Sequence, residues 1–132
     1  MANIPVQVNQ VGAATAEGHI RTHSVLIDRP EAKGGDDKGA MGGELLLVSL
    51  GGCFMSNLLA AIRAREAAIS DVKIAINGNL EGNPPHFTAI EMRISADYED
   101  RELLEKLVTI SERSCIVANT LKGSVDLSFV VE

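Results

Sequence analysis

A long apolar run is the feature that most constrains this chain, and it predicts a helix from about Glu44 to Ala68. The first half of the run is apolar almost all round, whereas the second half is amphipathic and exposes Arg63, Arg65 and Glu66. A helix that is apolar on every side must be covered on every side. A single chain of 132 residues could hardly provide that cover, so the run indicates an oligomer.

Two cysteines carry the reactive chemistry that this sequence offers. Cys53 lies within the apolar run directly after Gly51 and Gly52, and Cys115 is the only other cysteine. Their separation of 62 residues (115 − 53) lacks the C-x-x-C spacing of zinc and thioredoxin-type motifs. A cysteine on an apolar helix often serves only as a small core residue. The residues alone leave open whether the two thiols pack or perform redox chemistry.

Length and charge exclude several classes of protein. The length predicts one domain over 1–132, and the net charge of −6 argues against nucleic acid and anionic membranes as partners. No apolar run of about 18 residues suggests a membrane span, and the first five residues do not resemble a signal peptide. We therefore expect a cytoplasmic protein with free thiols and no cofactor. The histidines, which form no ligand cluster by spacing and indicate no metal site, are His19, His23 and His86.

Around the apolar helix, the hydrophobic pattern predicts strands. They are expected over about 6–11, Ile20–Asp28, Val72–Leu80, Phe87–Tyr98 and Val125–Val131, with turns near Glu17-Gly18 and at Asn83-Pro84-Pro85. The loop from Arg29 to Gly43 is rich in glycine and charge, so we expect it to be mobile or to wrap another element.

A second helix is predicted near the end of the chain. It begins at Asp100, a plausible N-cap, breaks around Ser114-Cys115 and resumes as a short helix to Leu121. The element order β-β-α-β-β-α-β indicates an α+β fold with antiparallel sheets.

A cysteine nucleophile would need an activating group in this sequence. The reactive form is the thiolate, and the apolar neighbours of Cys53 should raise the pKa of its thiol. Candidate cations are Arg21, His23 and Arg29, with Arg113 as a weaker one. Arg21 and His23 are two residues apart on a predicted strand, so their side chains should point the same way, either into a site or into solvent.

Two further features have both a packing and a functional interpretation. Glu44 is either a first-turn acid favoured by the helix dipole or a site residue. Four apolar side chains are either core residues or the walls of an apolar pocket, namely Met41, Phe54, Met55 and Phe87.

Several of these segments resemble the OsmC/Ohr family. They are Gly34-Gly35, the run from Glu44 to Gly51-Gly52-Cys53, and Cys115-x-Val117 before the last strand. The resemblance covers nearly the whole chain, and both cysteines fall on the helices that carry the family's thiols. The spacings Glu-x-x-x-x-x-x-Gly-Gly-Cys and His23-x-x-x-x-Asp28 are closer to a third, less characterised branch than to the organic hydroperoxide resistance branch.

This resemblance implies an OsmC-like intertwined homodimer. Antiparallel sheets would wrap around two long central helices, and strands from both chains would complete two six-stranded sheets. The second chain would then cover the apolar face from Leu45 to Leu59.

The resemblance also implies a thiol-dependent peroxidase that reduces organic hydroperoxides, or hydrogen peroxide, in defence against oxidative stress. By matching position, Cys53 would attack the peroxide and become a sulfenic acid, and Cys115 would resolve it as a disulfide. A dithiol reductant such as a lipoylated protein would then reduce the disulfide. Glu44, Arg21 and His23 would be the further site residues.

The chain departs from the peroxidase branches at the activating groups. Those branches use an arginine on the first strand or hairpin, held by a glutamate ten residues before the first cysteine. Here no basic residue precedes His19, and the glutamate position is Gly43, while Glu44 falls on the opposite face of the helix. Ile116 also replaces the proline that often follows the second cysteine. These departures favour the alternative of a non-catalytic dimer that binds a small apolar ligand; a thiol-based stress sensor is a third alternative.

Overall fold

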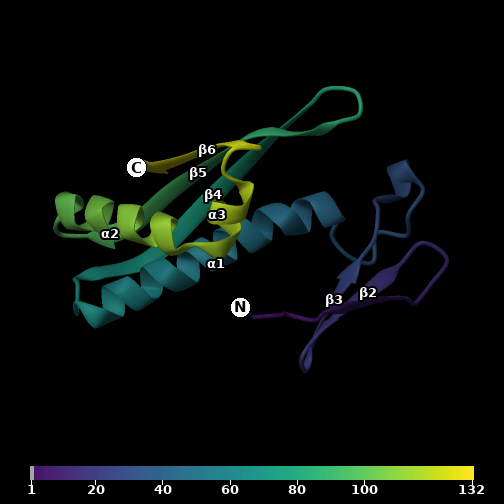
Figure 1. The fold of residues 1–132 in the computed structure, drawn as a ribbon, viewed down its shortest axis with the longest axis horizontal. Helices are drawn as coiled ribbons and strands as arrows, with labels where there is room; N and C mark the ends of the chain where they lie inside the picture. Colours follow the sequence, from purple (N-terminus) through teal and green to yellow (C-terminus); the bar gives the residue numbers. More distant parts are fainter. Residues whose placement is uncertain (1) are drawn as a thin grey trace. The chain divides into compact units, whose positions relative to one another are not determined.

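The computed structural model describes residues 2–132, which form two compact units. The first unit ends at Leu46, and the second spans Leu47–Glu132. Each unit has its own three-stranded sheet, the first coloured purple to blue and the second teal to yellow in Figure 1. The single domain that the length predicts stays a prediction.

The sheet of the first unit is antiparallel, in the order β1-β2-β3. Its strands are β1 (Gln7–Gln10), β2 (Ala16–Ile20) and β3 (His23–Ile27). The prediction of two strands with a turn near Glu17-Gly18 was wrong, because Gly18 lies in the middle of β2. A Cβ at Gly18 would come within 3.2 Å of Val25 Cγ1, so the glycine serves close packing between neighbouring strands rather than a turn.

The loop after β3 is organised by one buried carboxylate. Asp28 is 3% exposed, and its two oxygens accept hydrogen bonds from Thr15 Oγ1 (2.8 Å), from the Arg29 N–H (2.6 Å) and from the Asp36 and Lys38 N–H groups. A short 3₁₀ helix, η1 (Glu31–Lys33), lies inside this loop. The loop thus folds around Asp28, the residue that follows β3, and does not show the wrapping of another element that was one of the two expectations; its mobility stays a prediction.

The long apolar helix is α1 (Gly42–Ala64), which begins two residues earlier and ends four residues earlier than predicted. It ends at Ala64 because the chain turns at Glu66, which has a φ of 48°, and a strand begins at Ile69. The buried positions Leu50, Phe54 and Leu58 recur every four residues, so they form one stripe along the helix. Within the single chain, the residues of α1 that are buried are this stripe and Gly51.

By length and composition, α1 is also long and apolar enough to cross a membrane. The prediction that no such run exists was therefore wrong. Glycines and serines interrupt the apolar residues, but the mean hydropathy of the helix stays high enough for a membrane span. The core helix of a protein without a membrane span meets the same criterion. The absence of a membrane partner stays a prediction.

The second unit has a sheet in the order β4-β5-β6, made of β4 (Ile69–Glu81), β5 (His86–Tyr98) and β6 (Asp126–Val131). β4 and β5 are antiparallel, as predicted, whereas β6 runs parallel to β5, so the prediction of purely antiparallel sheets was wrong. Two helices separate β5 from β6, and a helical crossover returns the chain to the same end of the sheet. These helices are α2 (Arg101–Ser114) and α3 (Ile116–Leu121).

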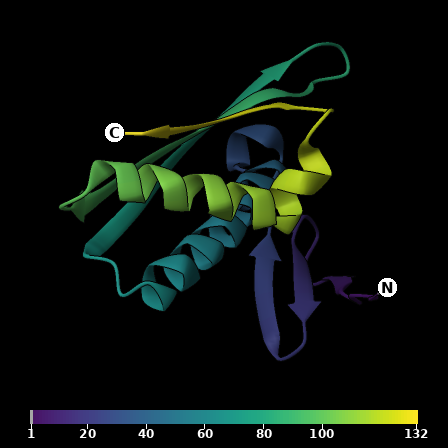
Figure 2. The ribbon, with the colours of Figure 1, turned by 60° about the vertical axis from the view of Figure 1, so that its left-hand side comes forward.

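The core of the second unit lies between this sheet and the helices α1 and α2, which are on the same side of the sheet in Figures 1 and 2. Ile90, Met92 and Ile94 alternate along β5 and are buried. The predicted N-cap is confirmed, since Asp100 Oδ1 accepts a hydrogen bond from the Leu103 N–H at 3.1 Å. The predicted break between the two helices also falls where the structure has it, at Cys115.

Candidate active site

The two cysteines, 62 residues apart in the sequence (115 − 53), come together in the second unit. Cys53 lies in the middle of α1, and Cys115 is the residue between α2 and α3. Both are free thiols, and Cys53 packs against the hydrophobic cluster that contains Cys115. Cys115 is 0% exposed, whereas Cys53 is only partly buried. The pair therefore has one sulfur that a solute reaches more easily and one that is enclosed.

The junction between α2 and α3 places Cys115 by local hydrogen bonds. Cys115 has an extended conformation (φ −77°, ψ 113°), which ends α2, and its sulfur accepts a hydrogen bond from the Ala118 N–H at 3.4 Å. It thus caps α3 in the place where a serine or aspartate commonly stands. Asn119 Nδ2 donates to the Arg113 carbonyl oxygen at 3.1 Å, which ties α3 back to the last turn of α2.

The surroundings of Cys53 favour its thiolate. Partial burial by itself raises the pKa of the Cys53 thiol, but three hydrogen-bond donors lower it, and the net pKa lies below the ordinary value for cysteine. In order of effect these donors are the N–H of Val117, the thiol of Cys115 and the N–H of Ile116. The N–H groups at the start of a helix have no partner within that helix, so they are free to face a sulfur.

The surroundings of Cys115 have the opposite effect. Burial raises the pKa of the Cys115 thiol, and the hydrogen bond to Cys53 and the charge of Cys53 raise it further. The N–H groups of Ala118 and Val117 offset this only in part. Because the two pKa values move apart, Cys53 ionises first and Cys115 keeps its proton.

The predicted cations Arg21 and His23 lie in the first unit and are exposed. Arg21 is in the turn between β2 and β3 with a φ of 53°, and His23 is the first residue of β3. The expectation that they share a strand face was wrong, because the turn separates them. Arg29 is also exposed in the first unit. The roles of these three residues at Cys53 stay predictions.

Glu44 and Arg113, the other charged candidates, have structural contacts. Glu44 Oε1 accepts a hydrogen bond from the Met41 N–H at 2.8 Å, so Glu44 caps the first turn of α1, which favours the helix-end interpretation. Arg113 is exposed in the last turn of α2, and its carbonyl, rather than its guanidinium, makes the contact with Asn119. A site role for Glu44 stays a prediction.

Sequence reasoning missed the groups that act on Cys53. The N–H groups of Ile116 and Val117 carry no side-chain signal, and they became donors because Cys115 interrupts the helix just before them. The predicted break at Ser114-Cys115 was the available signal, since a new helix start always presents unpaired N–H groups.

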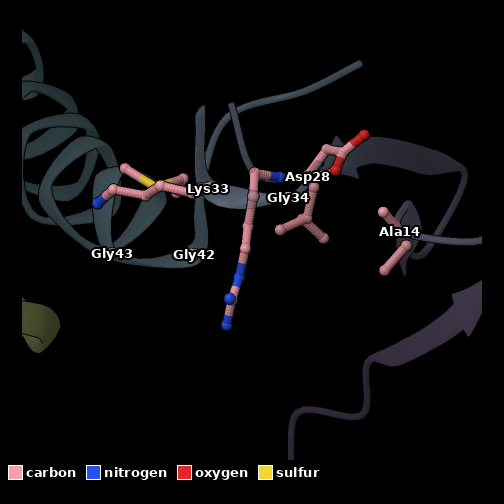
Figure 3. Close-up of a pocket in the computed structure, with 10 residues that line it drawn as sticks. Ala14, Asp28, Lys33, Gly34, Gly42 and Gly43 are labelled. Carbon is pink, nitrogen blue, oxygen red and sulfur yellow. Dashed lines mark hydrogen bonds between the residues drawn. The ribbon is translucent and has the colours of Figure 1, made fainter. Parts of the chain in front are cut away.

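Two of the four residues of the predicted apolar pocket have other surroundings within their own units. Phe54 is 0% exposed and its ring centroid lies 5.0 Å from that of Phe129, so it is a core residue. Met41 instead lines an open cavity of about 750 Å³ within the first unit. Figure 3 shows Asp28, Lys33 and Gly42 around this cavity. Its one carboxylate, Asp28, is already occupied by Thr15 and by loop N–H groups.

Over residues 2–132, no three histidine, cysteine, aspartate or glutamate side chains are grouped so that they could hold a metal ion. The reactive groups of the candidate site are its two free thiols. One thiol has a lowered pKa and the other a raised pKa. The structure is thus that of an α+β protein with one cysteine on a long apolar helix and a second cysteine at a helix junction.

Within that class, the chain belongs to the family of OsmC-like proteins, whose sequence model matches residues 35–130. The match includes both cysteines and most of the chain. No curated protein matches the sequence.

Solved structures of the same fold cover the whole length of this chain. A hypothetical protein from Aquifex aeolicus VF5 is 24% identical with a TM-score of 0.86, covering 100% of this chain and 96% of that chain. An OsmC-like protein of unknown function from Vibrio cholerae is 13% identical with a TM-score of 0.83, covering 100% of both chains. The organic hydroperoxide resistance protein OhrB of Bacillus subtilis is 18% identical with a TM-score of 0.70, covering 99% of this chain and 98% of that chain. These similarities show the OsmC/Ohr fold.

Proposed function

We propose that this protein is a thiol-dependent peroxidase that reduces organic hydroperoxides, or hydrogen peroxide, through Cys53 and Cys115. The observation that carries the proposal is the pairing of a thiol whose pKa is lowered with a buried thiol whose pKa is raised. A thiolate is the nucleophile that attacks a peroxide, and a neighbouring thiol is what converts a sulfenic acid into a disulfide. Membership of the OsmC-like family supports the same assignment.

The chemistry takes place in two steps. The Cys53 thiolate attacks the terminal oxygen of the hydroperoxide, so an S–O bond forms, the O–O bond breaks, and Cys53 becomes a sulfenic acid. The leaving alkoxide takes a proton from water and departs as an alcohol. Cys115 then attacks the Cys53 sulfur, the S–O bond breaks, and a disulfide and water result. Two thiols are oxidised by two electrons, and one peroxide is reduced.

The difference in exposure supports this order of the two cysteines. Cys53 is partly exposed and Cys115 is fully buried, so a peroxide reaches Cys53 first. The Cys53 surroundings are rich in aliphatic side chains such as Leu50, which favours an alkyl hydroperoxide over the more polar hydrogen peroxide. A dithiol such as a lipoylated protein would complete the cycle, in the cytoplasm and as part of defence against oxidative stress.

A homodimer is the second part of the proposal. In the single chain, 22% of the most apolar stretch of α1 is buried, and large side chains such as Val48, Leu46 and Leu59 are exposed along it. The α1 helix of a second copy has the same apolar side chains, so the two helices would bury these side chains against each other without burying a charged group. Arg21, His23 and Glu44 would then act at Cys53 within the dimer.

The test is a titration of the reduced protein with one equivalent of cumene hydroperoxide. We expect the loss of two thiols and two hydrogens per chain, measured by thiol titration and intact mass, because the two sulfurs join as a disulfide. Cys53→Ser should lower peroxide consumption by at least about a hundredfold, since no thiolate remains at the more exposed position.

The outcome that would contradict the proposal is a protein whose thiols stay unchanged over many minutes with excess peroxide. That result would favour the alternative of a dimer that binds a small apolar ligand and uses the cysteines only for packing. Ligand-dependent shifts of the melting temperature would then be the next measurement.

A further inference from the structure

We propose that the cavity of the first unit binds a small phosphate monoester through the side chains of Arg29 and Lys33. The cavity has a volume of about 750 Å³, which is within the range of small-molecule sites, and its walls come entirely from residues 14–43. This inference goes beyond the proposed peroxidase function, because both cysteines belong to the second unit.

The two cations of the cavity have no counter-ion within the chain. Among residues 2–132, neither Arg29 nor Lys33 forms an ion pair. The contact between Arg29 and Asp28 is made by the backbone N–H of Arg29 and leaves its guanidinium free of that carboxylate. A chain whose net charge is −6 thus gathers two unpaired cations at one cavity, and such a pair attracts an anion.

The carboxylate of Asp28, which also lines the cavity, is engaged elsewhere. It is 3% exposed, and its two oxygens accept hydrogen bonds from Thr15 Oγ1 at 2.8 Å and from backbone N–H groups of the loop. Figure 3 shows Lys33 on the side of the cavity where α1 begins, and Asp28 on the side of Ala14. Three other acidic side chains of the loop are exposed and do not line the cavity, namely Glu31, Asp36 and Asp37.

The loop that carries both cations is held by its own backbone. The Lys33 N–H donates to the Pro30 carbonyl oxygen at 2.9 Å, and the Asp37 N–H donates to the Arg29 carbonyl oxygen at 3.0 Å. A Cβ at Gly35 would collide with the Arg29 carbonyl group, so the chain passes this point as closely as a glycine allows. Because the backbone is already folded around the cavity, binding of a ligand loses little conformational entropy.

The charges and the remaining walls of the cavity indicate the class of ligand. A phosphoryl group carries up to two negative charges near neutral pH and has three acceptor oxygens, so it can pair with both cations at once. A single carboxylate would leave one of the two cations unpaired. Four apolar side chains offer a surface for a compact organic group, namely Ala14, Ala16, Ile27 and Met41.

The test is isothermal titration calorimetry of the wild type with phenyl phosphate, benzoate and inorganic phosphate at pH 7.5. Benzoate keeps the ring with one negative charge, and inorganic phosphate keeps the phosphoryl group without the ring. We expect phenyl phosphate to bind saturably at one site per chain, and each of the other two to bind at least about tenfold more weakly. Raising the salt concentration from about 0.05 to about 0.5 M should weaken the binding of phenyl phosphate, since exposed charges are screened.

Four substitutions locate the site. Arg29→Gln and Lys33→Gln each remove one cation and should weaken the binding of phenyl phosphate about three- to tenfold. Lys38→Gln is the matched control, because Lys38 belongs to the same loop and carries the same charge but does not line the cavity, so affinity should stay within about twofold.

Gly42→Glu blocks the cavity without disturbing the fold. A Cβ at Gly42 would meet no atom within 4 Å, and an acidic side chain in the first turn of a helix is favourable, so we expect an unchanged melting temperature and no binding of phenyl phosphate.

The inference is overturned if phenyl phosphate at about 10 mM gives no saturable heat, which would mean a site weaker than the millimolar range. Equal affinities for phenyl phosphate and benzoate, or for phenyl phosphate and inorganic phosphate, would overturn it as well. The same holds if Lys38→Gln weakens binding as much as Lys33→Gln, or if a folded Gly42→Glu variant binds like the wild type. Failure of the peroxidase proposal is distinguishable, because these heats are measured without any peroxide.

Discussion

At the scale of single residues, two chemically identical thiols differ because of what surrounds each of them. The donors that face Cys53 lower the pKa of its thiol, and burial raises the pKa of Cys115. The sequence nominated both cysteines, since they are the only two, and their order came from the family resemblance alone, because neither residue type nor spacing ranks their reactivity. The ranking depends on N–H groups at residues 116 and 117, which lie far from Cys53 in the chain.

A second residue whose behaviour comes from its surroundings is Asp28. Burial alone would raise the pKa of its carboxyl, yet hydrogen bonds from Thr15 and from the N–H groups of Arg29, Lys38 and Asp36 outweigh this and lower the pKa below its ordinary value. The folded state therefore favours the carboxylate. This carboxylate stabilises the folded chain above the unfolded pKa of about 3.9, and the stabilisation is lost as the pH falls through the lowered folded pKa.

We therefore predict that Asp28→Asn lowers the melting temperature at pH 7. One carboxylate oxygen, which accepts hydrogen bonds from backbone N–H groups, would be replaced by an amide NH₂ group that cannot accept them. The difference from the wild type should begin to narrow below about pH 4, where the unfolded chain takes up a proton at this carboxyl, and it should close only below the lowered pKa of the folded carboxyl. Thermal unfolding followed by circular dichroism between pH 7 and pH 3 measures both effects. Asp126→Asn, at an exposed position of β6, is the matched control and should change little. An unchanged melting temperature for Asp28→Asn at pH 7 would refute this account of the loop.

At the scale of elements, two adjacent glycines of α1 have different surroundings. A Cβ at Gly51 would collide with the Cδ1 atom of Ile76 on β4, whereas a Cβ at Gly52 would meet no atom within 4 Å. Gly51 is buried and Gly52 is exposed. The first glycine therefore lets the helix approach the sheet, and the second has no packing role within the single chain.

This difference predicts different effects of the same substitution. Gly51→Ala should be less stable than Gly52→Ala by about 1 kcal/mol, because the Cδ1 end of Ile76 must turn away to admit the new methyl group and this offsets the gain in helix propensity. Gly52→Ala should stabilise the protein by up to about 1 kcal/mol, since alanine has the better helix propensity. Denaturant unfolding of both variants measures the two free energies. Equal stabilities of the two variants would contradict the close packing of α1 on β4.

The sheets were only partly predictable from the hydrophobic pattern. The β4–β5 hairpin depends on the alternation of apolar and polar residues, and the N-cap of α2 depends on the side chain of Asp100. Both signals are local, so the sequence predicted both features. The pattern could not give the parallel direction of β6, because that direction depends on the helical crossover that returns the chain to the same end of the sheet. It also did not separate the third N-terminal strand from its neighbour. The turn expected near Glu17-Gly18 failed for a related reason, since a neighbouring strand uses the space at Gly18.

At the scale of the whole molecule, the main question is what covers α1. The side chains of Val48, Leu59 and Leu46 are 63%, 50% and 38% exposed in the single chain. Apolar side chains that are this exposed along one helix are typical of a surface that associates. The composition of the helix predicted an oligomer for the same reason.

We predict that the wild type is a dimer in solution and that Val48→Glu weakens it by at least about a hundredfold, because a buried, unpaired carboxylate is costly. Light scattering coupled to size-exclusion chromatography, over a range of protein concentrations, measures the dissociation. Leu80→Glu, at a position of β4 that is 60% exposed, is the matched control and should leave the mass unchanged. A monomeric wild type would overturn the dimer proposal.

The sequence by itself determined the long apolar helix, the hairpin that follows it and the helix break that carries Cys115, because each depends on residues close together in the chain. The tertiary structure alone decided which thiol ionises first and which hydrogen bonds hold the loop after β3. It also decided which of the two adjacent glycines lets α1 pack closely on the sheet. Each of these depends on atoms that meet only after folding, such as the Ile116 and Val117 N–H groups at Cys53, and a pattern of neighbouring residues does not encode such contacts.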